Sequence, residues 1–329
     1  MIKVGILIPE GEIIVSSIIP VYEIFKGINN YYRSIREHNE DYFEIELIGL
    51  TKRVEKYNGS IVFTPTNTID KVGKLDIIFI TTITGDMEKS LKINAPYIPW
   101  LIKQYRKYGA ELASFCSGAF LLAETGLCDG KSISTHWVVA DLFKERYPGV
   151  KLTPEAVITD QDGIYSSGGA FSLLNLILYI IEKYCGRDIA IWCSKMYEID
   201  FDRINQNQFV IFNGQKEHTD SEIKNAQIFI EKNYPDRILV DQLAKTFAIS
   251  RRNFIRRFKK ATDNTPTEYI QRVKVEAAKK RFEAYTESIS EVMYKIGYSD
   301  SKAFRTIFKK YTGLSPIDYK RKYNKSMAK

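Results

Sequence analysis

Cys116 stands where a side-chain thiol could act as a nucleophile. The apolar run Glu111–Phe115 predicts a short strand, and Cys116-Ser117-Gly118-Ala119 leads from it into an apolar helix. A cysteine on such a turn lies at the carboxyl end of a sheet strand, where open α/β sheets hold their ligands. The amino terminus of the helix is expected to lower the thiol pKa and to favour the thiolate.

Three roles remain open for this cysteine. It could attack a substrate with His136, from the triplet Thr135-His136-Trp137, as a remote base. It could instead be a small residue that fills a tight turn, while His136 caps or braces a helix. In the third role, Cys116 and His136 line a pocket for a small effector.

A second chemistry, the reading of DNA bases, is indicated by the stretch Ser288–Tyr319. Ser288 begins a Ser-x-x-Glu capping box, an apolar helical stripe follows, and Gly297 ends the helix. Asp300 or Ser299 can cap the next helix. That second helix turns phenylalanines inward and a basic, polar face outward, which suits insertion into a DNA major groove.

The same pattern occurs twice, at an interval of 50 residues. Seven identical pairs carry the repeat: Phe254 and Phe304, Phe258 and Phe308, Lys259 and Lys309, Lys260 and Lys310, Thr262 and Thr312, Pro266 and Pro316, and Tyr269 and Tyr319. In the first copy Val240–Phe247 predicts the first helix, and Ser250 is expected to cap the second. Pro266–Phe282 can form a long connecting helix, because proline at the first helical position costs no hydrogen bond. Two units joined in this way can reach successive major-groove segments about 34 Å apart.

Upstream of the repeat, apolar runs alternate with helical stripes. Strands are predicted at Ile2–Ile8, Phe43–Leu50, Leu75–Thr82 and Glu111–Phe115, and helices at Ile18–Ile28, Tyr97–Tyr108, Phe120–Thr125, Phe171–Tyr184 and Arg187–Tyr197. The alternation predicts an α/β sandwich with a mostly parallel sheet and helices on both faces. The polar segment Phe212–Asp220 predicts a linker, and Thr219 with Glu222 predicts the start of the next helix.

Charge divides the chain at the same place. Residues 221–329 hold 25 lysines and arginines against 12 acidic residues, whereas residues 1–220 hold 23 against 28. The C-terminal third is basic and the rest of the chain is mildly acidic, which favours a polyanion that binds the C-terminal third alone. The sequence has no apolar run long enough to span a membrane, and we expect its first residues to form a strand and not a secretory signal. Its four cysteines form no Cys-x-x-Cys pair, so we expect reduced thiols in a cytoplasm, with no metal and no cofactor.

Three segments carry a family resemblance in the first two-thirds of the chain. They are ASFCSGAFLLAETGLCDGKSISTHW, YPGVKL and YSSGGAFSLLNLILYIIEKYCG. Residues 1–212 thereby resemble the ThiJ/PfpI-type, class I glutamine amidotransferase-like domain, a flavodoxin-like sandwich, in the GlxA-type branch that is fused to AraC-type DNA-binding domains.

The resemblance also implies that this domain is not an enzyme. Enzymatic relatives commonly have a histidine after the elbow cysteine, where this chain has Ser117. Many relatives also have an acidic residue four positions before the proline that follows the first strand; here Ser16 precedes Pro20. The candidate effector pocket is therefore formed by Cys116, Ser117, His136 and Ser16.

The run Gly297-Tyr298-Ser299-Asp300, with Phe308-Lys309 and Gly313-Leu314-Ser315-Pro316 after it, resembles the AraC/XylS family. The likeness covers residues 222–322 and implies an all-α domain with two helix-turn-helix units. The base-facing candidates are Arg251, Arg252, Ile255 and Arg256 in the first unit and Ser301, Lys302, Arg305 and Thr306 in the second. Family members often carry arginine at the position of Thr306 and a small residue at that of Arg305, and here the two are exchanged. Lys259, Lys260, Lys309 and Lys310 are expected to contact phosphates or to remain solvated.

These features predict an α/β sensor or dimerisation domain (1–212), a linker (213–221), a DNA-binding domain (222–322) and a basic tail (323–329). The expected function is that of a cytoplasmic transcriptional regulator that binds double-stranded operator DNA as a homodimer. A small-molecule effector and RNA polymerase are further candidate partners, and no membrane is involved. Two alternatives remain: a Cys-dependent amidase or deglycase with a DNA-binding appendage, and an architectural nucleic-acid binder without an operator.

Overall fold

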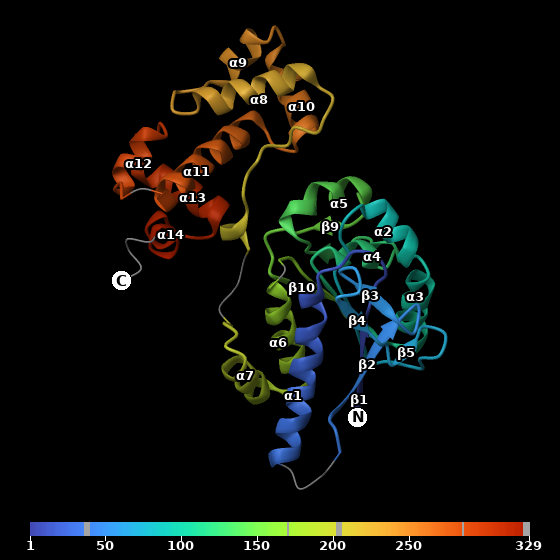
Figure 1. Cartoon of the computed structure of the whole chain (residues 1–329). Coiled ribbons are helices and arrows are strands. Elements are labelled where there is room, and N and C mark those ends of the chain that lie inside the picture. The colour runs from blue at the N-terminus through green and yellow to red at the C-terminus, as the bar shows by residue number, and fades with distance from the viewer. Residues whose placement is uncertain (36–39, 170, 202–205, 285, 325–329) are drawn as a thin grey trace. The chain divides into compact units, whose positions relative to one another are not determined.

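The computed structural model describes residues 1–35, 40–169, 171–201, 206–284 and 286–324. The chain divides into two compact units, Met1–Gln206 and Asn207–Lys329, which are described separately (Figure 1). The predicted linker 213–221 belongs to the second unit. Of the predicted basic tail, residues 325–329 lie outside the described residues. Within the described ranges, no helix has both the length and the apolar character needed to cross a membrane.

A seven-stranded sheet forms the centre of the first unit, in the order β10-β11-β7-β6-β1-β2-β5. Its strands are β1 (Ile2–Leu7), β2 (Phe43–Gly49), β5 (Asn67–Thr68), β6 (Ile77–Ile80), β7 (Glu111–Phe115), β10 (Ile158–Gln161) and β11 (Ile164–Ser167). The pairs from β11 to β5 are parallel, and β10 pairs with β11 antiparallel. Two small sheets pair β3 (Val54–Lys56) with β4 (Ile61–Phe63) and β8 (Ser132–Ile133) with β9 (Lys151–Leu152). The predicted mostly parallel sheet is confirmed.

Helices cover both faces of this sheet. One face packs against α1 (Ile19–Ile35), α6 (Ser172–Cys185) and α7 (Arg187–Met196). The other face packs against α2 (Met87–Asn94), α3 (Tyr97–Tyr108), α4 (Gly118–Ala123) and α5 (Ala140–Arg146). In β6, Ile77 and Phe79 enter the first core and Ile78 and Ile80 the second. Successive side chains of a strand point to opposite faces, so burial on both sides explains why these strands are continuous apolar runs.

The second unit is helical. It begins with a short 3-10 helix, η3 (Asn207–Phe209). The helices that follow are α8 (Ser221–Asn233), α9 (Val240–Thr246), α10 (Arg251–Thr262), α11 (Pro266–Ala284), α12 (Ile289–Lys295), α13 (Ser301–Thr312) and α14 (Pro316–Tyr323). They enclose two apolar cores, one around Phe254 and Phe258 and the other around Phe304 and Phe308.

The two cores reveal a repeat of four helices in which α11 is shared. The first half of α11 closes the first repeat with Tyr269, and α14 closes the second with Tyr319. In the second repeat, the second half of α11 occupies the place that α8 occupies in the first repeat. Ile223, Ala226 and Ile230 of α8 correspond to Val275, Ala278 and Phe282 of α11, an offset of 52 residues. The same offset relates Glu231, which accepts a hydrogen bond from Tyr269 Oη, to Glu283, which accepts one from Tyr319 Oη.

The turns between the paired helices differ by one residue. Four residues separate α9 from α10, and five separate α12 from α13. Ala248 and Gly297 occupy the same place after their helices, with φ of 53° and 77°. Because the extra residue follows this position, α9 and α12 match at an offset of 49, whereas α10 and α13 match at 50.

Several helix caps are as predicted. Ser288 and Glu291 form the capping box, and Asp300, one of the two candidates, accepts hydrogen bonds from the N–H groups of Lys302 and Ala303. The start of α8 was predicted wrongly: its cap is Asp220, which accepts from Ile223 N, and not Thr219. Asp220 also binds Arg257 through two hydrogen bonds, which lowers the pKa of this carboxyl group.

Candidate nucleic-acid interface and effector pocket

Helix α10 presents a cationic face to solvent. Phe254 and Phe258 anchor its inner face in the first core, and Arg251, Arg252 and Arg256 are exposed. Within the described contacts, Ser250 makes no side-chain cap hydrogen bond, although it begins the helix as predicted. The helix therefore exposes three arginines while its phenylalanines are buried.

The candidate side chains on α10 differ in their exposure and in their contacts within the protein. Arg251 Nε lies 2.6 Å from Asp241 Oδ1 of α9, and both side chains are about two-thirds exposed. Arg256 donates to the Oδ1 of Asn253, one turn earlier, at 2.8 Å. Ile255 is half-buried, so it offers only part of its side chain to a partner. Exposed ion pairs are weak, and a phosphate or guanine can displace both acceptors.

Helix α13 repeats this arrangement with different side chains. Ser301, Lys302, Arg305 and Thr306 are exposed, and Phe304 is buried behind them. Thr306 Oγ1 donates to the carbonyl of Lys302 at 2.9 Å, so its hydroxyl is turned back onto its own helix. Arg305 and Lys302 are the long, exposed donors on this face.

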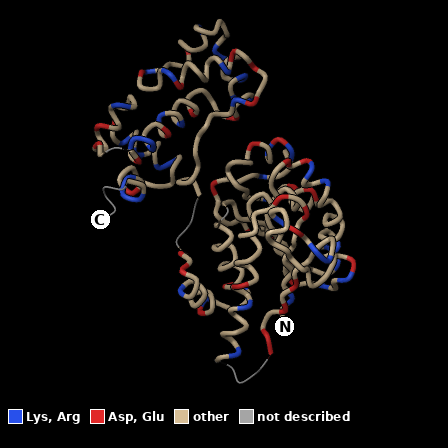
Figure 2. The backbone as a smooth tube through the Cα atoms, in the orientation of Figure 1, with Lys and Arg blue, Asp and Glu red and all other residues tan. Residues whose placement is uncertain are grey.

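The paired lysines of the repeat end both helices. Lys259 and Lys260 lie in the last turn of α10, and Lys309 and Lys310 lie in that of α13; all four are exposed. Cations in the last turn stabilise a helix by their interaction with its dipole, so these lysines have a structural role even without DNA. Figure 2 shows lysine and arginine recurring along the second unit, interspersed with acidic residues.

The elbow at Cys116 has a strained backbone and a buried thiol. The φ of Cys116 is 52°, in the left-handed region that side-chain-bearing residues rarely adopt. Its N–H donates to Ser167 O, and its carbonyl accepts from Thr135 Oγ1, both at 2.8 Å. Burial raises the pKa of the Cys116 thiol. The predicted lowering of that pKa is therefore wrong, because loss of solvent outweighs the hydrogen bonds from Ser117 that lower it.

The other predicted pocket residues serve local structure. Ser117 Oγ donates to Ile83 O at 2.5 Å. His136 caps the 3-10 helix η2 (Trp137–Val139), where its Nδ1 accepts from Val138 N, and burial lowers the pKa of its imidazole. Ser16 lies half-buried in η1 (Val15–Ser17), and its neighbour Ser17 meets Thr82 Oγ1 at 3.0 Å. The structure thus gathers these segments at the carboxyl ends of β6 and β7.

Sequence reasoning missed three buried polar side chains in the first unit. Ser167 Oγ, Ser172 Oγ and Gln206 Oε1 have no hydrogen-bond partner among the residues that the structure describes. Ser167 ends β11 beside Cys116, whereas Gln206 Nε2 donates to the carbonyl of Thr135. Buried polar atoms are usually paired, so these groups can receive a polar ligand or water. The Tyr-Ser-Ser-Gly-Gly run at 165–169 was the available signal.

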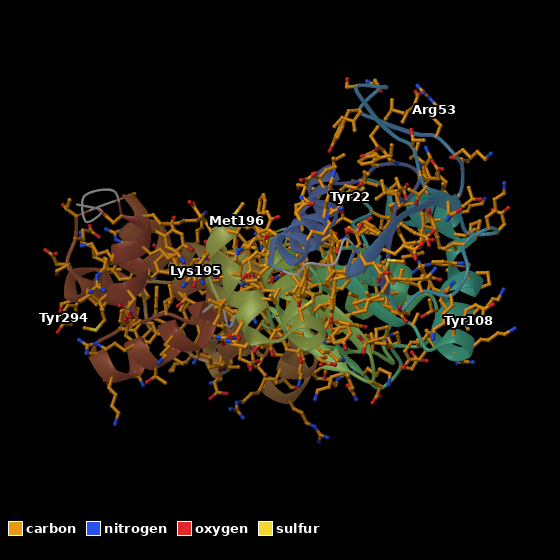
Figure 3. The ribbon with its side chains drawn as sticks, turned by 90° about the horizontal axis from the view of Figure 1, so that it is seen from below. Tyr22, Arg53, Tyr108, Lys195, Met196 and Tyr294 are labelled. Atoms are coloured by element: carbon orange, nitrogen blue, oxygen red, sulfur yellow. The ribbon has the colours of Figure 1, made fainter. Side chains whose placement is uncertain are left out.

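A separate cavity of about 360 Å³ lies between α1 and α7. Tyr31 and Trp192 stack in its wall with ring centroids 4.3 Å apart. Figure 3 shows Met196, a further lining residue, at the end of α7, where 63% of it is exposed. This hollow contains none of the elbow residues. In the described part of the chain, no cluster of three or more histidine, cysteine or acidic residues could hold a metal ion.

Comparison with known proteins divides the chain in the same way. Residues 28–183 match the model of the DJ-1/PfpI family, and residues 243–322 match that of a helix-turn-helix domain. The HTH-type transcriptional regulator ArgR of Pseudomonas aeruginosa is 25% identical over 225 residues, which cover 68% of each chain. The regulator GbdR of the same species is 25% identical over 256 residues, covering 78% of this chain and 68% of GbdR.

Solved structures match the α/β fold. A Vibrio parahaemolyticus protein superposes with a TM-score of 0.52 at 23% identity and covers 59% of this chain and 98% of its own. A ThiJ/PfpI family protein from Pseudomonas syringae superposes with a TM-score of 0.50 at 16% identity, covering 75% and 90%. These likenesses confirm the predicted flavodoxin-like fold.

Proposed function

We propose that this chain, in which a DJ-1/PfpI domain precedes an AraC-type helix-turn-helix domain, is a transcriptional regulator that reads operator DNA with α10 and α13. The matched family models and the regulators among its relatives support the DNA-binding role. The proposal extends to the residues that read the operator and to a first unit that responds to a small effector.

The observation that carries the proposal is the duplicated helix-turn-helix unit with an exposed cationic face on each second helix. Arg252 and Arg256 project from α10, and Lys302 and Arg305 from α13. Arginine reads guanine through two parallel donors, and lysine binds the same groove edge. Two reading helices on one rigid unit suit successive major-groove segments on one side of the duplex.

Charge reversal on α10 tests the reading role. Genomic fragments bound by the wild-type chain are first enriched, and the affinity for one enriched duplex is then measured at fixed salt. Arg252→Glu and Arg256→Glu are each expected to weaken binding by about 100-fold, since a lost guanine contact of about 1–3 kcal/mol is joined by repulsion from phosphates.

Arg106→Glu is the matched control, because it makes the same charge change at an exposed position on α3 of the first unit. It should leave the affinity near the wild-type value. Undiminished binding by both α10 variants would overturn the proposed interface. Equal affinity for enriched and bulk DNA would instead support the architectural binder.

For the first unit, we propose an effector pocket formed by Cys116, Ser117, His136 and Ser16, with homodimerisation and contact with RNA polymerase as further functions. The buried hydroxyl of Ser167, beside Cys116, has no hydrogen-bond partner among the described residues, which supports a polar ligand there. Four unpaired cysteines suit the reducing cytoplasm.

Substitution of the elbow thiol separates this role from an enzymatic one. A nucleophilic thiol should be ionised near neutral pH, whereas burial raises the pKa of Cys116. We expect Cys116→Ala to retain regulated transcription from an enriched promoter. Turnover of an amide or a glycated amine by the wild-type chain, abolished in Cys116→Ala, would support the amidase or deglycase instead.

A further inference from the structure

The segment that leads into the DNA-binding helices contacts both helix-turn-helix repeats. We infer that residues 207–218, here called the brace, position α10 and α13 relative to each other, with Phe209, Phe212, Glu276 and Lys279 as positioning residues. This inference rests on the proposed DNA-binding function. Figure 1 shows the brace running from η3 past α11 toward α10 before the chain turns into α8.

The first part of the brace holds the second repeat. η3 packs against α13. Lys322, on α14, donates to Gln208 Oε1 at 2.7 Å, and its ammonium lies 5.5 Å from the centre of the Phe209 ring. These contacts fix the start of the brace to the third and fourth helices of the second repeat.

A buried ion pair fixes the middle of the brace to α11. Lys279 is 4% exposed, and its Nζ donates to Val210 O at 2.6 Å and to Glu276 Oε2 at 2.7 Å. The same carboxylate oxygen accepts from Phe212 N at 3.2 Å. A buried charge is stable only when it is paired and hydrogen-bonded. The brace backbone supplies part of that pairing, so the brace and this turn of α11 stabilise each other.

Phe212 connects the brace to both repeats through aromatic contacts. Its ring meets Tyr269, in the first core, edge to face at 5.2 Å. The Arg272 guanidinium lies 5.5 Å from the Phe212 ring and 5.1 Å from the ring of Tyr311, on α13. Arg272 thus joins the brace to the second reading helix by contacts of the cation–π type.

The last part of the brace holds the first repeat. Gln215 O accepts from Gln227 Nε2 of α8 at 2.9 Å, and Gln215 Oε1 accepts from Asn264 Nδ2, just beyond α10, at 3.2 Å. His218 Nε2 lies 2.9 Å from Gln227 Oε1. The repeats are therefore joined twice, through α11 and through the brace. A second connection removes the bending and twisting that a single helix would allow.

The position of the brace gives it a second consequence. It begins directly after Gln206, the last residue of the first unit. A change in the first unit that pulls this segment away from α11 would release α10 and α13 from their fixed relation. Binding to a two-part operator would then weaken, because the helices would have to be ordered again on the DNA.

The test measures how the full-length chain responds to altered spacing in its DNA. The probe is a duplex of about 30 base pairs, enriched from a random-sequence pool by the wild-type chain. It is compared with a version that has one base pair inserted between the two contacted segments, and with a version in which one segment is scrambled. Variants are Phe212→Ala and Phe209→Ala. The matched control is Phe229→Ala on α8, because Phe209 and Phe229 are both 38% exposed.

The wild type and Phe229→Ala should lose about tenfold in affinity or more on insertion, since a fixed pair of helices cannot follow the displaced segment. The two brace variants should lose about threefold or less. They should bind the scrambled duplex as the wild type does, which a general loss of folding would not allow. Phe209→Ala decides the outcome if Phe212→Ala unfolds.

If the brace variants lose as much affinity as the wild type when the base pair is inserted, the inference is overturned and the proposed function is unaffected. Failure of the wild type to enrich any sequence would overturn the proposed function, and the inference with it.

Discussion

Two residues in the left-handed backbone region follow α9 and α12, the second helices of the two repeats. Ala248 is exposed, with a φ of 53°, and Gly297 has a φ of 77° at the matching place. A β-carbon makes this conformation unfavourable by about 1–2 kcal/mol, and glycine avoids that cost. Ala248→Gly should therefore raise the free energy of unfolding by about 1 kcal/mol, as measured by urea denaturation.

The reverse change in the second repeat supplies the comparison. A β-carbon on Gly297 would lie 1.9 Å from Pro235 O and 2.8 Å from Lys274 Nζ. Gly297→Ala should thus lower the free energy of unfolding by about 3 kcal/mol, from backbone strain and overlap together. If Ala248→Gly destabilises the protein, the left-handed turn at that position is not a source of strain.

Individual residues also show how far the sequence could be interpreted. The position of Cys116 after a strand was predictable, because apolar runs mark buried strands. Its raised pKa was not, because the burial that raises it arises only when segments distant in the sequence fold together, such as the strand whose Ser167 O accepts from Cys116 N. At the start of α8, Thr219 and Asp220 are adjacent and both able to cap, and only the structure distinguishes them.

On the scale of single elements, α13 differs from the AraC/XylS pattern that it resembles in the order of two residues. Arg305 is exposed, whereas the hydroxyl of Thr306 bonds back to Lys302 O. Arg305→Ala should therefore weaken binding to an enriched duplex by about 1–3 kcal/mol. Thr306→Ala should change it by much less, since its hydroxyl is already engaged. Binding measured at fixed salt distinguishes the two, and a larger loss for Thr306→Ala would reassign the reading residue.

Elements with strong local signals were predictable to the residue. The helix Tyr97–Tyr108 ends at Gly109, whose φ of 74° closes it, and the strand Glu111–Phe115 follows. The hairpin of β10 and β11 was missed because Ile158–Gln161 is short and mostly polar. Asp162-Gly163 between these strands, both with positive φ, was the signal that could have revealed it.

The repeat itself was only partly visible in the sequence. Identities at an offset of 50 identify α10 and α13, because the buried phenylalanines recur without change. Correspondence between α8 and the second half of α11 includes few identities, Ala226 with Ala278 and Glu231 with Glu283, and the other matched core residues differ in type, such as Ile230 and Phe282. Periodicity alone could not reveal that one helix serves both repeats.

For the whole molecule, the boundary of the DNA-binding unit decides its stability. A fragment of residues 221–329 lacks the brace and Asp220, which caps α8 and binds Arg257. It should unfold at lower urea concentration than a fragment of residues 207–329. We expect a difference of about 3 kcal/mol, from the lost cap and the lost burial of Phe212. Equal unfolding midpoints would show that the brace does not stabilise the fold.

The polar composition of residues 212–220 concealed this role. Such segments usually connect domains, and the side chains that bond to Phe212 N and to Val210 O just before it, those of Glu276 and Lys279, lie more than 60 residues further along the chain. Charge and the two resemblances thus predict a domain organisation, whereas the inferred role of the connection required the contacts seen in the structure.

Helix α11 also sets the rotation and spacing between the two helix-turn-helix repeats. Val273 belongs to the first core and Val275 to the second, on one continuous helix of 19 residues. One residue inserted between them would rotate the second half by about 100° around the helix axis and shift it by about 1.5 Å. Substitutions on α10 and α13 can therefore change the preferred bases one at a time. Insertions in α11 cannot change the spacing between the two repeats in small steps, because each one also rotates the second repeat.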